Sequence, residues 1–145
     1  MNNLNTTTPI KDEMPRFDQC VCSLWIRERG VPNFIGSGTL LKIEQATFLI
    51  TAAHVIDAAL GQPLMIRNPI GLKQISGCGK LTRPASGSRQ DDRDDTAVMA
   101  LDEDTTAFVE SAYRPLPINF ADAKDCLFPE KPYAFFGFPW SKGDF

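Results

Sequence analysis

Turn-forming residues divide the chain into short apolar segments, and this division limits the possible fold more than any other feature of the sequence. The run Thr-Phe-Leu-Ile-Thr at 47–51 has the β-branched and aromatic residues of a buried strand. A short helical turn is expected at 53–60, because Gly-Gln-Pro at 61–63 stops a helix. Six strands are predicted, at 20–26, 33–41, 47–51, 64–67, 72–75 and 96–101. Short strands joined by glycine-marked bends predict an all-β protein with a six-stranded antiparallel barrel, whose closure removes exposed strand edges.

The rest of the 145 residues divides around this barrel. Residues 1–16 lack periodicity and collect Asn, Thr, Pro and charged side chains, which predicts a flexible leader. Several prolines after position 114 indicate a linker, and a new apolar aromatic run follows them. The expected organisation is a leader at 1–16, an N-terminal β-barrel at 17–114, an inter-barrel linker at 115–132 and the first strand of a truncated second barrel at 133–145.

Charge and hydropathy argue against several classes of protein. The net charge is −3 with a pI near 5.1, and Lys and Arg form no stripe suited to nucleic acid. The start of the chain lacks the apolar core of a secretory signal. No segment approaches the roughly eighteen apolar residues of a membrane-spanning helix. We therefore expect a cytoplasmic protein with no nucleic-acid and no membrane partner.

The four cysteines, at positions 20, 22, 78 and 126, have neither metal-site spacing nor the density of a secreted disulfide scaffold. Cys20 and Cys22 are expected on one face of a single strand, an arrangement that is too local to bridge comfortably. His54 is the only histidine, so a zinc site would need scattered partners. We expect reduced thiols without a disulfide, and neither a metal nor a cofactor.

Three motifs occur in a fixed order along the chain. They are Gly-Ser-Gly-Thr-Leu-Leu at 36–41, Phe-Leu-Ile-Thr-Ala-Ala-His-Val at 48–55 and Asp-Thr-Ala-Val at 95–98. Together they resemble the trypsin-like serine proteases of the chymotrypsin fold, and most of all the high-temperature-requirement branch and its bacterial relatives. The resemblance extends over residues 20–139. It implies a double-barrel fold, of which this chain carries the N-terminal half.

The resemblance also implies roles for two residues. His54, which closes the Thr-Ala-Ala-His turn, takes the position of the general base, and Asp95 takes that of the carboxylate that orients the imidazole. A serine hydroxyl needs such a base to accept its proton, and imidazole is the side chain that titrates near neutrality. His54 and Asp95 are therefore the predicted catalytic residues, and we expect them within hydrogen-bonding reach of each other.

Structural roles also stay open for these residues. A lone histidine after a turn of small residues is often a capping or core residue. The four acids at positions 91, 92, 94 and 95 form either a solvated charge run or a calcium-binding loop. Asp95 differs from the others because it alone directly precedes an apolar strand.

No residue of the sequence has the context of the expected nucleophile. Ser37 lies between two glycines, which are expected to let the strand bend and allow close approach of the backbone, so its predicted role is structural. Ser86, Ser88 and Ser141 lie outside any Gly-x-Ser-Gly-Gly or Gly-x-Ser-x-Gly frame. Cys78 precedes Asp95, whereas the family's nucleophile follows both the histidine and the aspartate.

The leading interpretation is a trypsin-like serine endopeptidase, present here as a fragment without its serine half and inactive by itself. Its expected partners are a peptide or protein substrate and the missing C-terminal barrel. The alternative is a non-catalytic barrel that binds a protein partner. In either case the barrel face that lacks its second half is expected to favour self-association.

Overall fold

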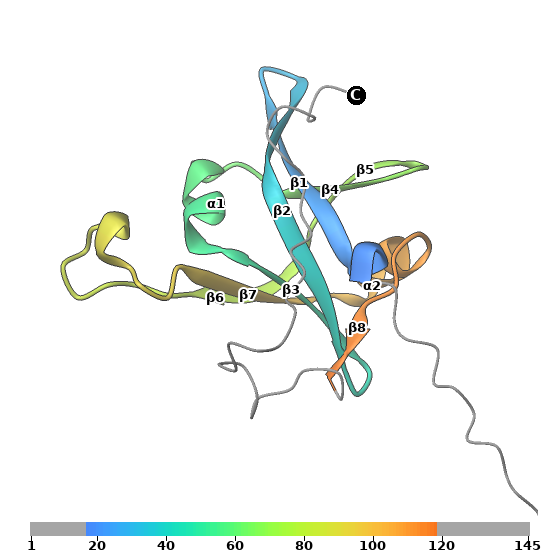
Figure 1. The fold of residues 1–145 in the computed structure, drawn as a ribbon. Coiled ribbons are helices and arrows are strands. Elements are labelled where there is room, and N and C mark those ends of the chain that lie inside the picture. Colours follow the sequence, from blue (N-terminus) through green and yellow to red (C-terminus); the bar gives the residue numbers. More distant parts are fainter. Residues whose placement is uncertain (1–16, 119–145) are drawn as a thin grey trace, which may run out of the picture.

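The computed structural model describes residues 17–118, which form a curled sheet with two short helices beside it (Figure 1). The longest strands come first and pair as hairpins. The strands are β1 (Val21–Glu28), β2 (Val31–Ile43), β3 (Ala46–Ala52), β4 (Met65–Asn68), β5 (Gly71–Gln74), β6 (Gly77–Leu81), β7 (Thr96–Leu101) and β8 (Leu116–Pro117). The helices are α1 (Ala53–Ala58) and α2 (Glu103–Glu110), with 3₁₀ turns η1 (Phe17–Cys20) and η2 (Arg89–Asp91).

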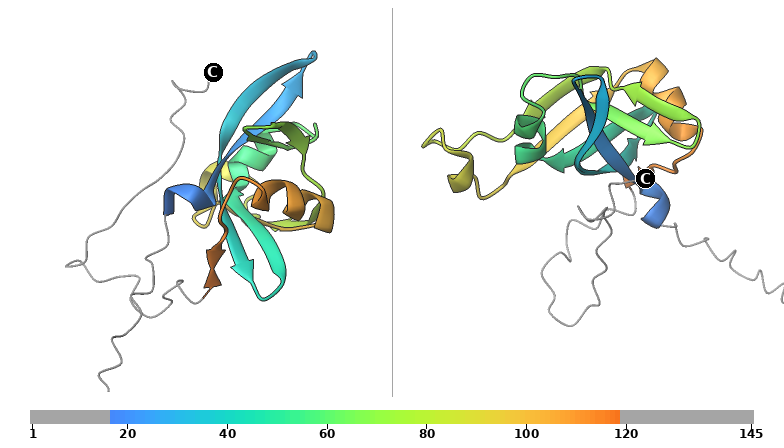
Figure 2. Two further views of the ribbon diagram at one scale, coloured as in Figure 1. Left: turned by 90° about the vertical axis from the view of Figure 1, so that its right-hand side faces the viewer. Right: turned by 90° about the horizontal axis from the view of Figure 1, so that it is seen from above.

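Strand pairing makes this sheet barrel-like. The hydrogen-bonded order is β5-β4-β1-β2-β3-β7-β6, all antiparallel, and β8 adds to β2 in parallel. The two ends of this order are neighbours in the sequence, because β5 ends at Gln74 and β6 begins at Gly77. Figure 2 shows how the strands curl around the inner face of the sheet. The expected all-β antiparallel architecture is confirmed, whereas the expected closure is not shown, since no pairing joins β5 to β6 in the described residues.

Large aliphatic side chains from several strands and both helices fill the interior. Leu40 faces Leu49 across the β2–β3 ladder, and Leu24 faces Ile66 across the β1–β4 ladder. All four are almost completely buried, as is Val109 of α2. Burying such a side chain contributes about 1.5–3 kcal/mol, so this cluster is a main source of stability.

Glycines in β2 permit the tight packing of this interior. A Cβ atom at Gly38 would lie 2.5 Å from a methyl carbon of Leu49 and 3.2 Å from the carbonyl oxygen of Ile50. A Cβ atom at Gly36 would lie 2.9 Å from a methyl carbon of Val55, in α1. The β1–β2 register shifts between Leu24 and Trp25, close to this point. The expectation that these glycines allow a bend and close approach is confirmed.

The structure has more elements than the sequence predicts. Eight strands are present in the described residues instead of six, because β6 and β8 are additional. β6 contains two glycines and is mostly exposed, so it lacks the apolar alternation that marks a strand. The helix α2 was also not expected. Within the predicted linker, Leu116–Pro117 form strand β8, which pairs with β2 in parallel.

The segments predicted as a leader and as the start of a second barrel lie outside the described residues. This applies to the predicted leader at 1–16, to most of the predicted linker and to the predicted strand at 133–145. In the part that the structure describes, no helix is long and apolar enough to cross a membrane.

No disulfide joins the cysteines that lie within residues 17–118. Cys22 is fully buried in β1, where burial raises the pKa of its thiol to about 12. Cys20 belongs to η1 and not to the strand, so the expected common strand face is wrong. Cys78 is exposed in β6, and Cys126 lies outside the described residues.

Candidate active site

Strand β3 carries His54 to the edge of the barrel. Thr51 near the end of β3 is buried, and its hydroxyl donates to the carbonyl oxygen of Ser37 in β2 at 2.8 Å. Helix α1 begins directly after the strand, with Ala53 fully buried. Val55 packs where Gly36 has no side chain. These contacts fix the first turn of α1 and leave His54 on its outer side.

Strand β7 brings Asp95 to the same place. Ala52 and Thr96 are the last pair of the β3–β7 ladder, so the residues just beyond them are neighbours. The amide of Ala53 accordingly donates to the carbonyl oxygen of Asp95 at 3.0 Å. The ladder thereby joins two residues that are 41 positions apart in the sequence, His54 and Asp95.

Both oxygens of the Asp95 carboxylate contact His54. Oδ2 lies 2.5 Å from Nδ1 of the ring, and Oδ1 accepts from the backbone amide of His54 at 2.9 Å. An ionised carboxylate only accepts hydrogen bonds, so Nδ1 carries the proton in this pair. The expectation that His54 and Asp95 lie within hydrogen-bonding reach is confirmed, whereas their part in catalysis stays a prediction.

These bonds stabilise the charged form of the carboxylate. The ring of His54 lowers the pKa of Asp95, and the amide of His54 adds to that effect, with partial burial opposing it. The Asp95 side chain is 33% exposed and that of His54 is 61% exposed. The hydrogen bonds of His54 within residues 17–118 involve its backbone amide and Nδ1, and none involves Nε2.

The neighbouring acids have different surroundings. The side chain of Asp92 is 5% exposed and is bonded to Arg89 and Thr82. Asp91 and Asp94 are exposed. Within residues 17–118, no group of three or more potential ligands could hold a metal ion, so the calcium-loop interpretation has no geometric support there.

The alternative nucleophiles have no hydrogen bond to His54 in the described part of the chain. Ser37 lies in β2, and its carbonyl oxygen is bonded to Thr51. Ser86 accepts from the amide of Ser88 at 3.2 Å, and Cys78 lies in β6. Ser141 lies outside the described residues.

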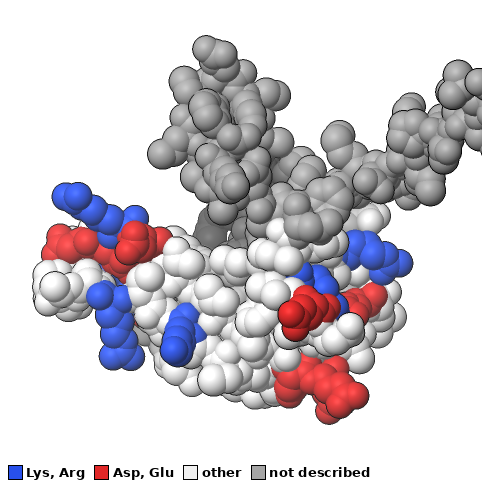
Figure 3. Space-filling view, turned by 90° about the horizontal axis from the view of Figure 1, so that it is seen from below, with Lys and Arg blue, Asp and Glu red and all other residues white. Residues whose placement is uncertain are grey.

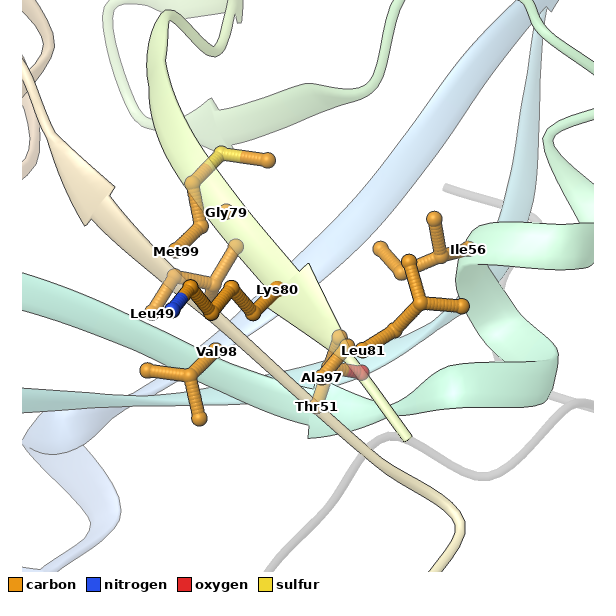
Figure 4. Close-up of a pocket in the computed structure, with 9 residues that line it drawn as sticks. All are labelled: Leu49, Thr51, Ile56, Gly79, Lys80, Leu81, Ala97, Val98 and Met99. Atoms are coloured by element: carbon orange, nitrogen blue, oxygen red, sulfur yellow. The ribbon is translucent and has the colours of Figure 1, made fainter. Parts of the chain in front are cut away.

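A small apolar pocket lies among β3, α1, β6 and β7 (Figure 4). Its volume is about 200 Å³, and neither His54 nor Asp95 lines it. Figure 4 shows Ile56 of α1 beside Leu81 of β6, with Met99 of β7 on the far side of the pocket. The pocket is therefore separate from the histidine–aspartate pair.

Sequence reasoning missed the polar residues that surround this pair. Arg89 bonds to Asp57 of α1 at 2.7 Å and to the carbonyl oxygen of Thr82 at 2.6 Å. The segment 83–93 was interpreted from its composition as a surface loop, and composition does not show which acid an arginine will meet. On the face seen in Figure 3, charges of both signs lie side by side, without a continuous basic stripe.

The arrangement is suited to general-base chemistry. With Asp95 accepting from Nδ1 of His54, the ring is held in one tautomer and one orientation, and Nε2 is the nitrogen that can accept a proton from a hydroxyl group placed beside it. Comparisons with protein-family models and with curated proteins found no match for this chain.

Proposed function

We propose that this chain supplies the general base and the orienting carboxylate of a trypsin-like serine endopeptidase. The observation that carries the proposal is the contact of both Asp95 oxygens with His54. The order and context of the three sequence motifs support the same function.

In this function His54 accepts a proton and gives it up again in each of the two half-reactions. Nε2 accepts the proton of a serine hydroxyl as the serine oxygen attacks the carbonyl carbon of the scissile peptide bond. The imidazolium, stabilised by Asp95, then gives that proton to the leaving amine as the carbon–nitrogen bond breaks. Water then attacks the carbonyl carbon of the acyl-enzyme while His54 accepts its proton, and His54 gives this proton to the serine oxygen as the carbon–oxygen bond breaks and the acid product leaves.

The nucleophile and the oxyanion donors come from polypeptide that is not part of these 145 residues. No serine after Asp95 stands in a glycine-framed turn, and the oxyanion donors of this family belong to that same turn. The chain alone should therefore hydrolyse neither peptide nor ester substrates. Labelling of Ser37 or Ser141 by a fluorophosphonate probe, lost in His54→Ala, would show that the nucleophile lies elsewhere than proposed.

The coding sequence beyond Phe145 tests the proposal directly. A Gly-x-Ser-Gly-Gly motif is expected there, and the extended protein should be labelled by a fluorophosphonate at that serine. The absence of any such serine from the full reading frame would reject the protease and leave a protein-binding barrel.

Variants of the extended protein separate the two roles. His54→Ala should lower kcat to the limit of detection, on the order of a millionfold. Asp95→Asn should lower it about 10⁴-fold, because the wrong tautomer is favoured. Asp94→Asn, a change at an exposed neighbouring acid, is the matched control and should retain activity. Equal activity in Asp95→Asn and Asp94→Asn would remove Asp95 from the mechanism.

A further inference from the structure

Arg89 joins the two segments that carry the candidate catalytic pair. Its Nε donates to Oδ2 of Asp57, in the same short helix as His54, at 2.7 Å. One terminal nitrogen donates to the carbonyl oxygen of Thr82 at 2.6 Å and also to the Asp92 carboxylate. The guanidinium is thus bonded to the helix on one side and to the loop before β7 on the other.

The loop side of this network ends at the backbone on either side of Asp95. The Asp92 carboxylate accepts from the amide of Asp94 at 3.2 Å and from the Thr82 hydroxyl at 2.5 Å. The same hydroxyl oxygen of Thr82 accepts from the amide of Thr96 at 3.0 Å. The peptide group after Asp95 is therefore held by Thr82, and the amide of Asp94, one residue before it, is held by Asp92.

Asp95 needs such support because its backbone is strained. Its φ is +35°, in the left-handed region that side chains other than glycine seldom adopt. Such a conformation costs on the order of 1–3 kcal/mol and persists only where the surroundings determine it. In this conformation the carboxylate reaches both the ring and the amide of His54.

We propose that Arg89 is a positioning residue that keeps the Asp95 carboxylate against His54 by linking Asp57 of α1 to Asp92 of the loop. The proposal deepens the proposed function, since its consequence for reaction rate rests on that function. Whether Arg89 holds Asp95 against His54 can be measured without catalysis.

Arginine suits this position better than lysine. A planar guanidinium offers several donors in a fixed fork, whereas an ammonium is a point charge on a flexible stem. Arg89 donates to three acceptors from two different nitrogens. Its side chain is 22% exposed and that of Asp92 only 5%, so the pair is shielded better than an ordinary surface ion pair.

The test uses the single histidine as a probe. In the 145-residue chain, the Nδ1–H proton of His54 should give one downfield, exchange-protected ¹H–¹⁵N signal, because it is bonded to Asp95. We expect Arg89→Gln to lose this signal. Arg89→Lys, which keeps the charge but not the fork, should lose it too.

Arg93→Gln is the matched control, since Arg93 is an exposed arginine of the same loop. It should keep the signal at the intensity of the wild type. Asp57→Ala removes the helix end of the link at a side chain that is 49% exposed, and should also lose the signal while the protein stays folded. This variant keeps the test decisive even if Arg89→Gln unfolds.

Two results would overturn the proposal. Wild-type intensity in folded Arg89→Gln or in Asp57→Ala would show that the link does not hold the pair. Loss of the Nδ1–H signal in Arg89→Gln with its full retention in Arg89→Lys would show that a positive charge at this position is sufficient and that the guanidinium geometry is not needed. If the variants behave as expected but the extended protein lacks a reactive serine, the positioning role stands and the protease is rejected.

Discussion

The barrel interior and the corner around His54 belong to one sheet but are held in different ways. In the interior, Leu24, Leu40 and Ile66 are fully buried and contact one another through apolar surface. At the corner, the side chain of His54 is 61% exposed, its ring is bonded to one oxygen of Asp95, and its backbone amide donates to the other. Apolar burial is non-directional, whereas a hydrogen bond fixes an angle.

The difference suggests that stability and site geometry can be changed separately. Substitutions in the interior should lower the free energy of unfolding, because each removes contacts from a close-packed cluster. Substitutions in the Arg89–Asp57–Asp92 network should chiefly loosen the histidine–aspartate pair.

Leu40→Ala should have the largest effect. Leu40 is fully buried opposite Leu49, so its truncation leaves a cavity as well as lost burial. The free energy of unfolding should fall by about 2–5 kcal/mol. Denaturant titration measures this, with Leu60→Ala as control, because Leu60 is 83% exposed and its truncation should change stability by no more than about 0.5 kcal/mol. Similar losses of unfolding free energy in the two variants would contradict the assignment of Leu40 to the interior.

Gly38→Ala tests the interior from the opposite direction, by adding volume. The new Cβ atom would meet Leu49 at 2.5 Å, so side chains must shift. Overpacking of this kind costs about 1–3 kcal/mol. Gly79→Ala is the comparison, since its nearest contact is 3.2 Å and the loss measured by denaturant titration should be smaller. A larger loss at Gly79 would mean that β6, and not β2, is the tightly packed strand.

Strands are predictable from the sequence where apolar and polar residues alternate or where an apolar run is continuous. Strands without either pattern are not. Strand β7 was predicted with its observed bounds, because its apolar run follows an acidic cluster. Strand β6 was missed because its residues are mostly exposed and its pairing with β7 depends on the backbone. The sequence carries a start signal for helix α2, because Asp102 is a typical N-cap residue and acids follow it in the first turn.

At the candidate site, the sequence predicts the histidine–aspartate pair but not the residues that hold it in place. His54 and Asp95 were identified by motif order, and the β3–β7 ladder places them together. Arg89, Asp57 and Thr82 carry no motif, because their meeting depends on how the loop folds back on α1. Long-range polar contacts of exposed loops leave no periodic pattern in a sequence, so local reasoning does not find them.

Asp102→Ala should have a moderate effect outside the site. The Asp102 carboxylate accepts from the amide of Thr105 at 2.8 Å and caps α2, whose Val109 is buried in the interior. Loss of such a cap costs about 0.5–2 kcal/mol. The His54 Nδ1–H signal should nevertheless be retained, because α2 does not touch the pair. If the signal is lost as well as stability, the interior and the corner around His54 are coupled.

Asp95→Asn should have the smallest effect on stability, and that effect should depend on pH. The folded-state pKa of Asp95 is lowered, mainly by the ring of His54, relative to an ordinary value of about 4. A lowered pKa stabilises the fold above the unfolded-state value, and this contribution is lost as the pH falls through the folded-state value. The wild type should therefore be more stable than Asp95→Asn at pH 6 to 7, and the difference should shrink as the pH falls below about 4. Unfolding curves of both proteins between pH 7 and pH 2.5 measure the difference. A difference that grows toward acid pH would reverse the sign of the linkage and show that the carboxylate is not held in its ionised form by His54.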